Sequence, residues 1–274
     1  MGMRRTSPGA LVAAAALACT PTLLKAADVN YTDTYSTNTS ANYTTTDGDA
    51  GLTSAWTVNG GTLNYSRTGT ASWASGVYLL NPSVASTAGQ TNVKVSGDFI
   101  GNPNYTSGNY YQPGLVIAGD PTNGGFTIQE YENGAYQYHL VLLRETGPQL
   151  IGDEGGTGNP PVLADFGTIA GHLTDNYHIS ATLDRSGANP VFNVSITDLT
   201  TGLPVVTNQV VTDAADPANY GGTQVGWRAR YSGNGAAFGV DNLSVATVPE
   251  PASLSLLALG AGALLARRPR RSSL

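Results

Sequence analysis

Glu130 and Glu132 are the two residues of this sequence whose spacing best suits acid–base chemistry. Residues i and i+2 of a strand project from the same face, and two carboxyl groups roughly 5–5.5 Å apart can run retaining glycoside hydrolysis as nucleophile and acid. The pair also adjoins Asn133-Gly134, a hairpin turn in which solvated acids are common. Catalysis by this pair is one interpretation, and a solvated turn is the alternative that we favour.

A second group of acids suits a hard cation. Asp47 and Asp49 form a loop pair, and Asp33 and Asp241 lie on the first and last predicted strands. Those strands often neighbour each other in sandwich folds. Carboxylate and carbonyl oxygens are the ligands that Ca²⁺ prefers. A structural calcium ion at these four residues is one interpretation, and solvated turn acids are the other; no cofactor is otherwise indicated.

The remaining catalytic or metal-binding patterns are weak. His172, Asp175 and His178 have the clustering of zinc ligands, but His178 belongs to the polar face of a predicted strand and His172 to the turn before it. The sequence contains no Gly-x-Ser-x-Gly nucleophile motif and no glycine-rich phosphate loop. These observations favour a protein that is not an enzyme.

Aromatic residues near predicted turns suit sugar binding. Tyr105, Tyr110 and Tyr111 lie among asparagines and a glutamine in one segment, and Trp56 and Trp73 also lie near turns. Aromatic faces stack on sugar rings, while amides bind hydroxyl groups. The alternative is that the tryptophans belong to the core and the tyrosines cap loop edges.

Apolar and polar residues alternate with period two along most of the chain, which predicts the strands that position these side chains. Segments 93–99, 177–183, 192–196 and 225–231 each read as a strand with one buried and one wet face. Residues 115–118 read as a fully buried strand, 126–132 and 135–145 as a hairpin, and 102–113 and 152–161 as surface loops. About a dozen strands joined by polar turns predict an all-β, two-sheet antiparallel sandwich.

The two ends of this predicted domain resemble concanavalin A-like (LamG-type) sandwiches. The opening DTYSTNTSANYTTTDGDAGLTSAWTVNGGTLNY resembles their first strand and Trp-containing second segment, and the closing VGWRARYSGNGAAFGVDNLSV resembles their last two strands. A galactose-binding-like jelly roll would give a similar pattern. Laminarinase-type hydrolases on the concanavalin A-like fold carry a Glu-x-Asp-x-x-Glu strand, which is absent here.

The N-terminus has the layout of a secretory signal peptide. Arg4 and Arg5 precede an apolar run over 11–18, and small residues follow as far as Ala27. We predict a signal peptide over 1–27. Cys19, the only cysteine, lies within it, so the exported protein would have no disulfide. A lipoprotein box ending at Cys19 is the alternative.

The net charge of the domain predicted over 28–247 restricts the classes of partner that it can bind. Of 13 basic residues, three lie in 1–27 and four follow residue 266, and Glu250 is the only acid outside the domain. The domain therefore carries six basic and 18 acidic residues, a formal charge of −12. Such acidity argues against nucleic acid and favours cations or neutral sugars as partners.

The C-terminal segment 248–274 reads as a sorting signal. Val248, Pro249, Glu250 and Pro251 precede an apolar helix predicted over 252–266, and a cluster beginning with Arg267 and Arg268 follows. Fifteen residues reach only ~22 Å as a helix, short of a ~30 Å hydrocarbon core, but arginines can snorkel, and such clusters stay on the cytoplasmic side.

The order of these parts resembles the PEP-CTERM sorting signal of exported bacterial proteins. That resemblance implies an exosortase, a membrane protease of transpeptidase type, as partner. An ordinary single-span anchor is the alternative.

Taken together, the sequence predicts an exported protein of the cell envelope or extracellular matrix, held transiently in the inner membrane by its C-terminal helix. We expect a non-catalytic binding or structural module associated with exopolysaccharide or another glycan. The alternative is a glycan-acting hydrolase that uses Glu130 and Glu132.

Overall fold

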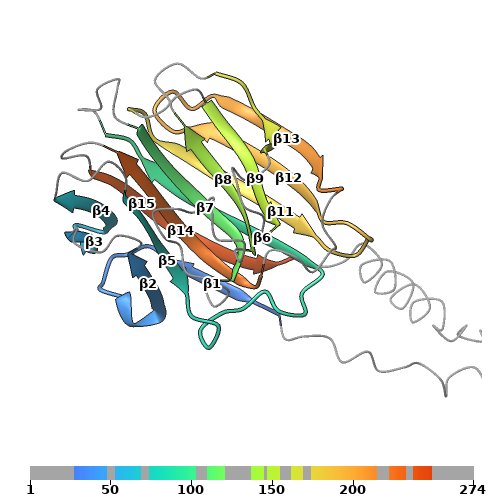
Figure 1. Ribbon diagram of the computed structural model, residues 1–274, viewed down its shortest axis with the longest axis horizontal. Helices are drawn as coiled ribbons and strands as arrows, with labels where there is room; N and C mark the ends of the chain where they lie inside the picture. Colours follow the sequence, from blue (N-terminus) through green and yellow to red (C-terminus); the bar gives the residue numbers. More distant parts are fainter. Residues whose placement is uncertain are drawn as a thin grey trace, which may run out of the picture.

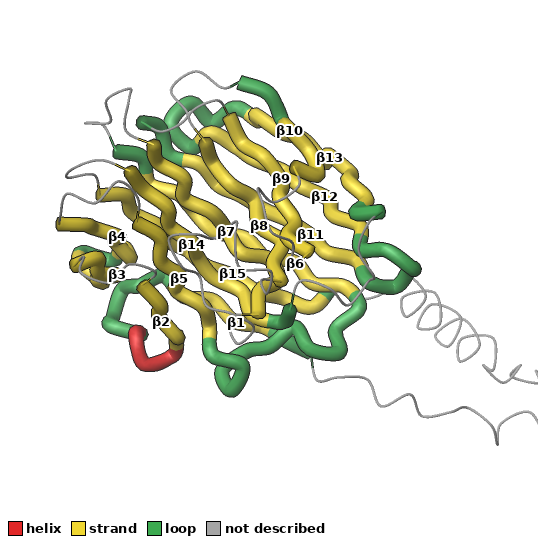
Figure 2. The backbone as a smooth tube through the Cα atoms, viewed as in Figure 1, coloured by secondary structure: helices red, strands yellow, loops and turns green. Residues whose placement is uncertain are grey.

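The structure, a computed structural model, describes residues 28–47, 53–68, 74–102, 110–120, 137–144, 147–154, 162–168, 174–214, 222–232 and 237–248. These residues form fifteen strands and one 3-10 turn, η1 (Ser40–Asn42). Figure 1 shows the strands in two packed layers, and Figure 2 shows how little other regular structure accompanies them.

One layer is an eight-stranded sheet. It contains β1 (Asn30–Asp33), β3 (Thr53–Asn59), β4 (Thr62–Thr68), β6 (Asn92–Ile100), β11 (Tyr177–Asp184), β12 (Val191–Asp198), β13 (Pro204–Thr212) and β15 (Ala237–Thr247). Their order is β13–β12–β11–β6–β15–β4–β3, with β1 also paired to β15. The first and last strands are therefore neighbours, as the sequence predicts.

The other layer is a seven-stranded sheet. It contains β2 (Tyr43–Asp47), β5 (Ala74–Leu80), β7 (Tyr110–Asp120), β8 (Gln137–Arg144), β9 (Gly147–Glu154), β10 (Val162–Asp165) and β14 (Gln224–Ser232). Their order is β10–β9–β8–β7–β14–β5–β2, and neighbouring strands in both sheets are antiparallel. The predicted all-β, two-sheet antiparallel sandwich is confirmed.

In the eight-stranded sheet, the period-two alternation of apolar and polar residues gives alternating burial, as predicted. Along β11 every second residue, from Tyr177 to Leu183, is buried, and the residues between are partly exposed. β6 and β12 show the same alternation, and Gly97 completes the buried face of β6. One face of this sheet packs on the core and the other is open and polar.

The seven-stranded sheet differs from the prediction. We expected a wet face on β14, but Arg228 is only 2% exposed, and Val77 and Leu79 of β5 and Val116 of β7 are fully buried on the same face. β14 lies inside the sheet, between β7 and β5. Burial lowers the pKa of Arg228 to about 9.

The two predicted surface loops are shorter than expected. β7 begins at Tyr110, where Tyr110 and Tyr111 pair with Ser232 and Tyr231 of β14, and β9 runs to Glu154, which pairs with Gln137 of β8. Ladder pairing thus overrides the local turn composition. The predicted buried strand at 115–118 is confirmed, because all four residues are fully buried in β7.

Aromatic side chains fill the core at one end of the sandwich. Tyr43 stacks on Tyr78 with ring centroids 4.2 Å apart, and Trp56 contacts Tyr65 at 4.8 Å. Trp227 reaches from β14 to the eight-stranded sheet, where its indole lies against Gly97. These contacts hold the two layers together.

The predicted chain ends lie outside the described residues, both the signal peptide (1–27) and the apolar helix (252–266). Within the described part, no helix is long and apolar enough to cross a membrane.

Candidate functional site

Several residues predicted as site candidates fall outside the described part of the chain. They are Glu130, Glu132, Tyr105, Trp73, Asp49, His172, and, in the sorting signal, Pro249, Glu250, Pro251, Arg267 and Arg268. The backbones of Tyr110 and Tyr111 lie at the start of β7, and that of Asp47 ends β2.

Trp56 lies at the edge of the core. Its ring is tilted against Tyr65 and Tyr78, and it meets Phe238 edge-on with centroids 6.0 Å apart. The side chain is partly exposed but packs against the core cluster. This placement matches the core alternative for Trp56.

Asp33 organises the chain between β1 and β2. Its Oδ1 accepts from the Tyr35 N–H at 2.8 Å, and its Oδ2 accepts from the hydroxyls of Thr39 at 2.6 Å, Tyr43 at 2.8 Å and Tyr31 at 3.2 Å. Asp33 is only 5% exposed, so its oxygens are directed to these protein donors. Its role in the described structure is to hold this turn.

The predicted cation ligands are brought together only in part. Asp33 pairs with Leu243, two residues beyond Asp241, so these two acids lie near each other. Among the described residues, however, no group of three or more His, Cys, Asp or Glu side chains could hold a metal ion. The calcium site stays a prediction.

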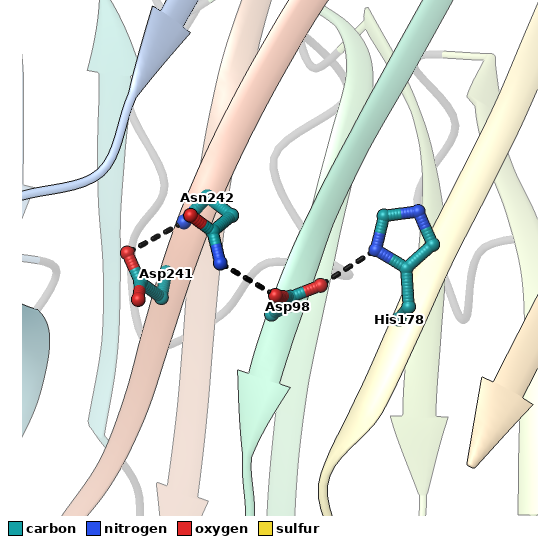
Figure 3. Close-up of polar contacts among 4 residues, drawn as sticks. All are labelled: Asp98, His178, Asp241 and Asn242. Carbon is teal, nitrogen blue, oxygen red and sulfur yellow. Dashed lines mark hydrogen bonds and ion pairs between the residues drawn. The ribbon is translucent and has the colours of Figure 1, made fainter. Parts of the chain in front are cut away.

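A connected polar cluster lies on the outer face of the eight-stranded sheet (Figure 3). Asp98 of β6 faces His178 of β11, with Asp98 Oδ1 2.6 Å from His178 Nδ1. On its other side, Asp98 Oδ2 accepts from Asn242 Nδ2 at 2.7 Å. The Asn242 N–H in turn donates to Asp241 Oδ1 at 2.7 Å. Three strands, β6, β11 and β15, thus hold one hydrogen-bonded group.

A bulge in β15 creates this geometry. Asp241 lies opposite Asp98, but the register with β6 shifts before Ser244. Asn242 occupies the bulge with a φ of 52°, a left-handed conformation that asparagine tolerates better than most residues. The bulge therefore places both the Asp241 carboxylate and the Asn242 amide beside Asp98.

The electrostatics of the cluster are dominated by its carboxylates. Partial burial raises the pKa of Asp241, the Asn242 N–H opposes this, and the charges of Asp98 and Asp33 raise it further. The His178 side chain is 40% exposed, while that of Asp98 is 14% exposed. The cluster thus presents a histidine ring to solvent over an oriented carboxylate.

Hydroxyl and amide side chains extend the cluster across the sheet. Opposed residues of neighbouring strands share a face, and the outer face carries Thr32, Ser96, Ser180, Thr182, Asn193, Ser195, Thr197 and Ser244, all partly or fully exposed. This face can donate to and accept from a polyhydroxylated ligand over several strands.

The sequence indicated only part of this site. His178 and Asp98 stand on polar faces of predicted strands, and the Asp-Asn pair at 241–242 appears in the closing segment. That Asp98 binds both His178 and Asn242 depends on the β6–β11 register and on the bulge, neither of which a single sequence reveals.

Comparison with known proteins identifies the tail and the fold. Residues 247–271 match the PEP-CTERM protein-sorting motif. No curated protein sequence matches the chain. Similar solved structures include arcelin-5, a lectin-like defence protein from Phaseolus vulgaris (TM-score 0.51, 12% identity, covering 82% of this chain and 100% of that one).

Two further neighbours have the same kind of fold. Lectin UEA-II, solved in complex with galactose, has a TM-score of 0.51 at 9% identity and covers 80% of this chain and 98% of its own. The Emp46p carbohydrate recognition domain (Y131F mutant) has a TM-score of 0.51 at 8% identity and covers 77% of this chain and 90% of its own. The chain therefore combines a lectin-like, concanavalin A-like sandwich with a PEP-CTERM signal, which marks export and processing at the membrane.

Proposed function

We propose that this protein is an exported, non-catalytic module that binds neutral polysaccharide outside the cell through the polar face of its eight-stranded sheet. We define the polar face by Asp98, His178 and Asn242 and the hydroxyl-bearing residues around them. The observation that carries the proposal is the Asp98-centred network, which fixes side chains of three strands toward solvent.

The chemistry of the polar face suits sugar hydroxyls. A carboxylate accepts hydrogen bonds from hydroxyls, the Asn242 amide can both donate and accept, and the His178 ring, whose Nδ1 faces Asp98, offers its Nε2 to a ligand. Because Asp98 is already held by His178 and Asn242, little side-chain entropy is lost when a ligand binds. Preorganised polar groups of this kind give orientation and specificity in carbohydrate sites.

Charge favours neutral over acidic glycans. The segment 28–247 carries 18 Asp and Glu residues and six Lys and Arg residues, and of those six β6, β11 and β12 place only Lys94 on the polar face. An acidic polysaccharide would be repelled. The lectin-like fold and the PEP-CTERM signal support the same proposal: an exosortase substrate that acts among extracellular glycans.

Binding to immobilised neutral and uronate-containing polysaccharides tests the proposal, with the full-length chain in detergent. We expect binding to neutral polymers, and an affinity loss of about tenfold or more for Asp98→Ala/His178→Ala, since hydrogen bonds to charged groups contribute ~1.5–3 kcal/mol. Thr57→Ala, an exposed change on β3 at the far end of the same sheet, should bind like the unchanged chain.

Two results would overturn the proposal. One is equal binding by the double variant and the unchanged chain. The other is release of reducing ends from the polysaccharide that Glu130→Gln abolishes, since this would make the protein a hydrolase.

A further inference from the structure

The first residue of the sorting motif lies inside the fold. The match to the PEP-CTERM motif begins at residue 247, and Thr247 is the last residue of β15. The next residue, Val248, is also held, because its N–H donates to the Asn92 carbonyl at 3.0 Å. Glu250 of the motif follows only two residues later. The sheet and the motif therefore adjoin directly at Val248.

The start of the described chain holds this junction from one side. β1 pairs with the last part of β15, where Asn30 lies opposite Ala246 (Figure 1). One residue further along, the Thr247 N–H donates to the Val29 carbonyl at 2.8 Å, and the Val29 N–H donates to Thr247 Oγ1 at 2.7 Å. Two hydrogen bonds of opposite direction thus join Val29 to the first residue of the motif.

The other edge of β15 is occupied by β6 and the segment before it. Val93 of β6 lies opposite Thr247. Gln90, only 6% exposed, brings its Oε1 to 3.5 Å from Thr247 Oγ1. We call the contacts of Val29, Gln90 and Asn92 with Thr247 and Val248 the junction clamp. The clamp engages the end of β15 on both of its edges.

A strand end held in this way is not available to a partner as an extended peptide. Proteins that bind extended peptides commonly pair with the peptide's own backbone N–H and C=O groups. The N–H groups of Thr247 and Val248 already donate within the sheet. From Val248 to Ala252, where the predicted apolar helix begins, the chain spans at most ~14 Å when fully extended. A membrane protease that reads this short segment must therefore work against the end of the sheet.

We propose that the junction clamp must open before the exosortase can bind the motif, so that the pairing of Val29 with Thr247 sets the rate of sorting. The opening frees Thr247 and Val248 from the sheet and breaks hydrogen bonds only. When opening and closing are fast relative to processing, the rate of processing follows the population of the open form. The inference rests on the part of the proposed function that makes this protein an exosortase substrate.

A reversible disulfide across the clamp tests this in the full-length chain. Val29 and Thr247 are opposed neighbours, one step beyond the antiparallel pair Asn30–Ala246, and a disulfide can span such a separation. Val29→Cys/Thr247→Cys adds the only cysteines after Cys19, and exported proteins form disulfides readily. In a bacterial host that carries an exosortase, pulse–chase labelling measures how fast the full-length chain becomes the processed one. We expect the oxidised variant to be processed about tenfold more slowly or worse, with recovery when a thiol reductant is added.

Two controls isolate the clamp. The reduced form of the same double variant should be processed at least as fast as the unchanged chain, which checks that the change within the motif is itself tolerated. Thr57→Cys/Asn64→Cys joins opposed residues of β3 and β4, at a distance from the junction in the same sheet. Its rate should be the same in the oxidised and reduced forms.

Val29→Pro loosens the clamp without changing the motif. It removes the N–H that donates to Thr247 Oγ1, and proline is tolerated where a strand begins. The loss of one hydrogen bond predicts processing that is about two- to tenfold faster. Circular dichroism checks that the sheet content is kept.

The outcomes separate this inference from the proposed function. If the oxidised and reduced clamp variants are processed equally fast, or if Val29→Pro is no faster than the unchanged chain, the clamp does not limit sorting and the inference is wrong, while the proposed function stands. If even the unchanged chain is not processed, the sorting part of the proposed function fails and the inference fails with it. If processing depends on the clamp but no glycan binds, only the proposed glycan binding is overturned.

Discussion

Trp227 of the seven-stranded sheet lies directly on Gly97 of the eight-stranded sheet. A Cβ atom at position 97 would lie 2.4 Å from Trp227 Cζ2 and 2.7 Å from Cη2, inside van der Waals contact. The same indole donates from Nε1 to the Tyr35 hydroxyl at 3.1 Å. One buried side chain thus sets the spacing of the two layers beneath the Asp98 cluster, because Gly97 precedes Asp98 on β6.

Gly97→Ala should destabilise the fold. The tryptophan is 1% exposed and has little room to move, so the added methyl forces the layers or the ring to shift. Overpacking of this kind costs roughly 1–3 kcal/mol. Urea unfolding measures the change. Gly187→Ala, whose nearest contact would be 3.7 Å, is the control. Equal stability of the two variants would contradict the packing argument.

Tyr35→Phe should also destabilise the protein, for a different reason. It leaves the buried Trp227 N–H without its acceptor, which costs about 1–3 kcal/mol. Tyr177→Phe is the matched comparison, since the buried Tyr177 hydroxyl has no hydrogen-bond partner among the described residues. We expect thermal unfolding to show a clear loss for Tyr35→Phe and little or none for Tyr177→Phe. The reverse order would refute this account.

Asp198 should stabilise the fold in a pH-dependent way. Burial acts to raise the pKa of Asp198, but hydrogen bonds from Thr201 and Thr200 outweigh it and hold the pKa below its ordinary value. A lowered carboxyl pKa contributes stability above the unfolded pKa of ~3.9 that is lost as pH falls through the folded pKa. The stability deficit of Asp198→Asn should therefore be largest near neutral pH and shrink below about pH 4. A deficit of the same size at pH 7 and pH 3 is the contrary result.

Asp241 should behave in the opposite sense. Burial and the charges of Asp98 and Asp33 raise its pKa, so the ionised form is disfavoured in the fold. The free energy of unfolding therefore rises as pH falls from the pKa of Asp241 in the folded protein toward its lower pKa in the unfolded protein. Asp241→Asn keeps an oxygen to accept the Asn242 N–H and should raise the melting temperature at pH 7. The gain should vanish below about pH 4. A lower melting temperature at pH 7 would count against this reading of the cluster.

Removal of residues 249–274 should release the protein from the membrane without unfolding it. β15 ends at Thr247, and the Val248 N–H donates to the Asn92 carbonyl at 3.0 Å, so truncation after Val248 keeps both sheets. Cell fractionation measures retention, and circular dichroism checks that the β-sheet is kept. Full-length Arg267→Ser/Arg268→Ser separates the basic cluster from the rest of the motif. Unchanged retention of the truncated chain would refute sorting by this segment.

The sequence by itself determined the faces of several strands and the export signal. The alternation in 177–183 and 192–196 and the apolar run at 115–118 predict burial that depends on nearest neighbours along one strand, and the structure has that burial. The PEP-CTERM motif is equally local, because its parts are contiguous in the chain. Local patterns of this kind need no knowledge of which strands pair.

Only the tertiary structure decided which polar residues meet. Asp98 and His178 are 80 residues apart, and Asp98 and Asn242 are 144 apart. Arg228 alternates onto the face of β14 that the sequence predicts to be open, yet its side chain is only 2% exposed. A groove lined by residues of β10 and β13 exists because these two strands end different sheets on the same side. Long-range register and sheet order set these contacts, and a period-two pattern carries information about neither.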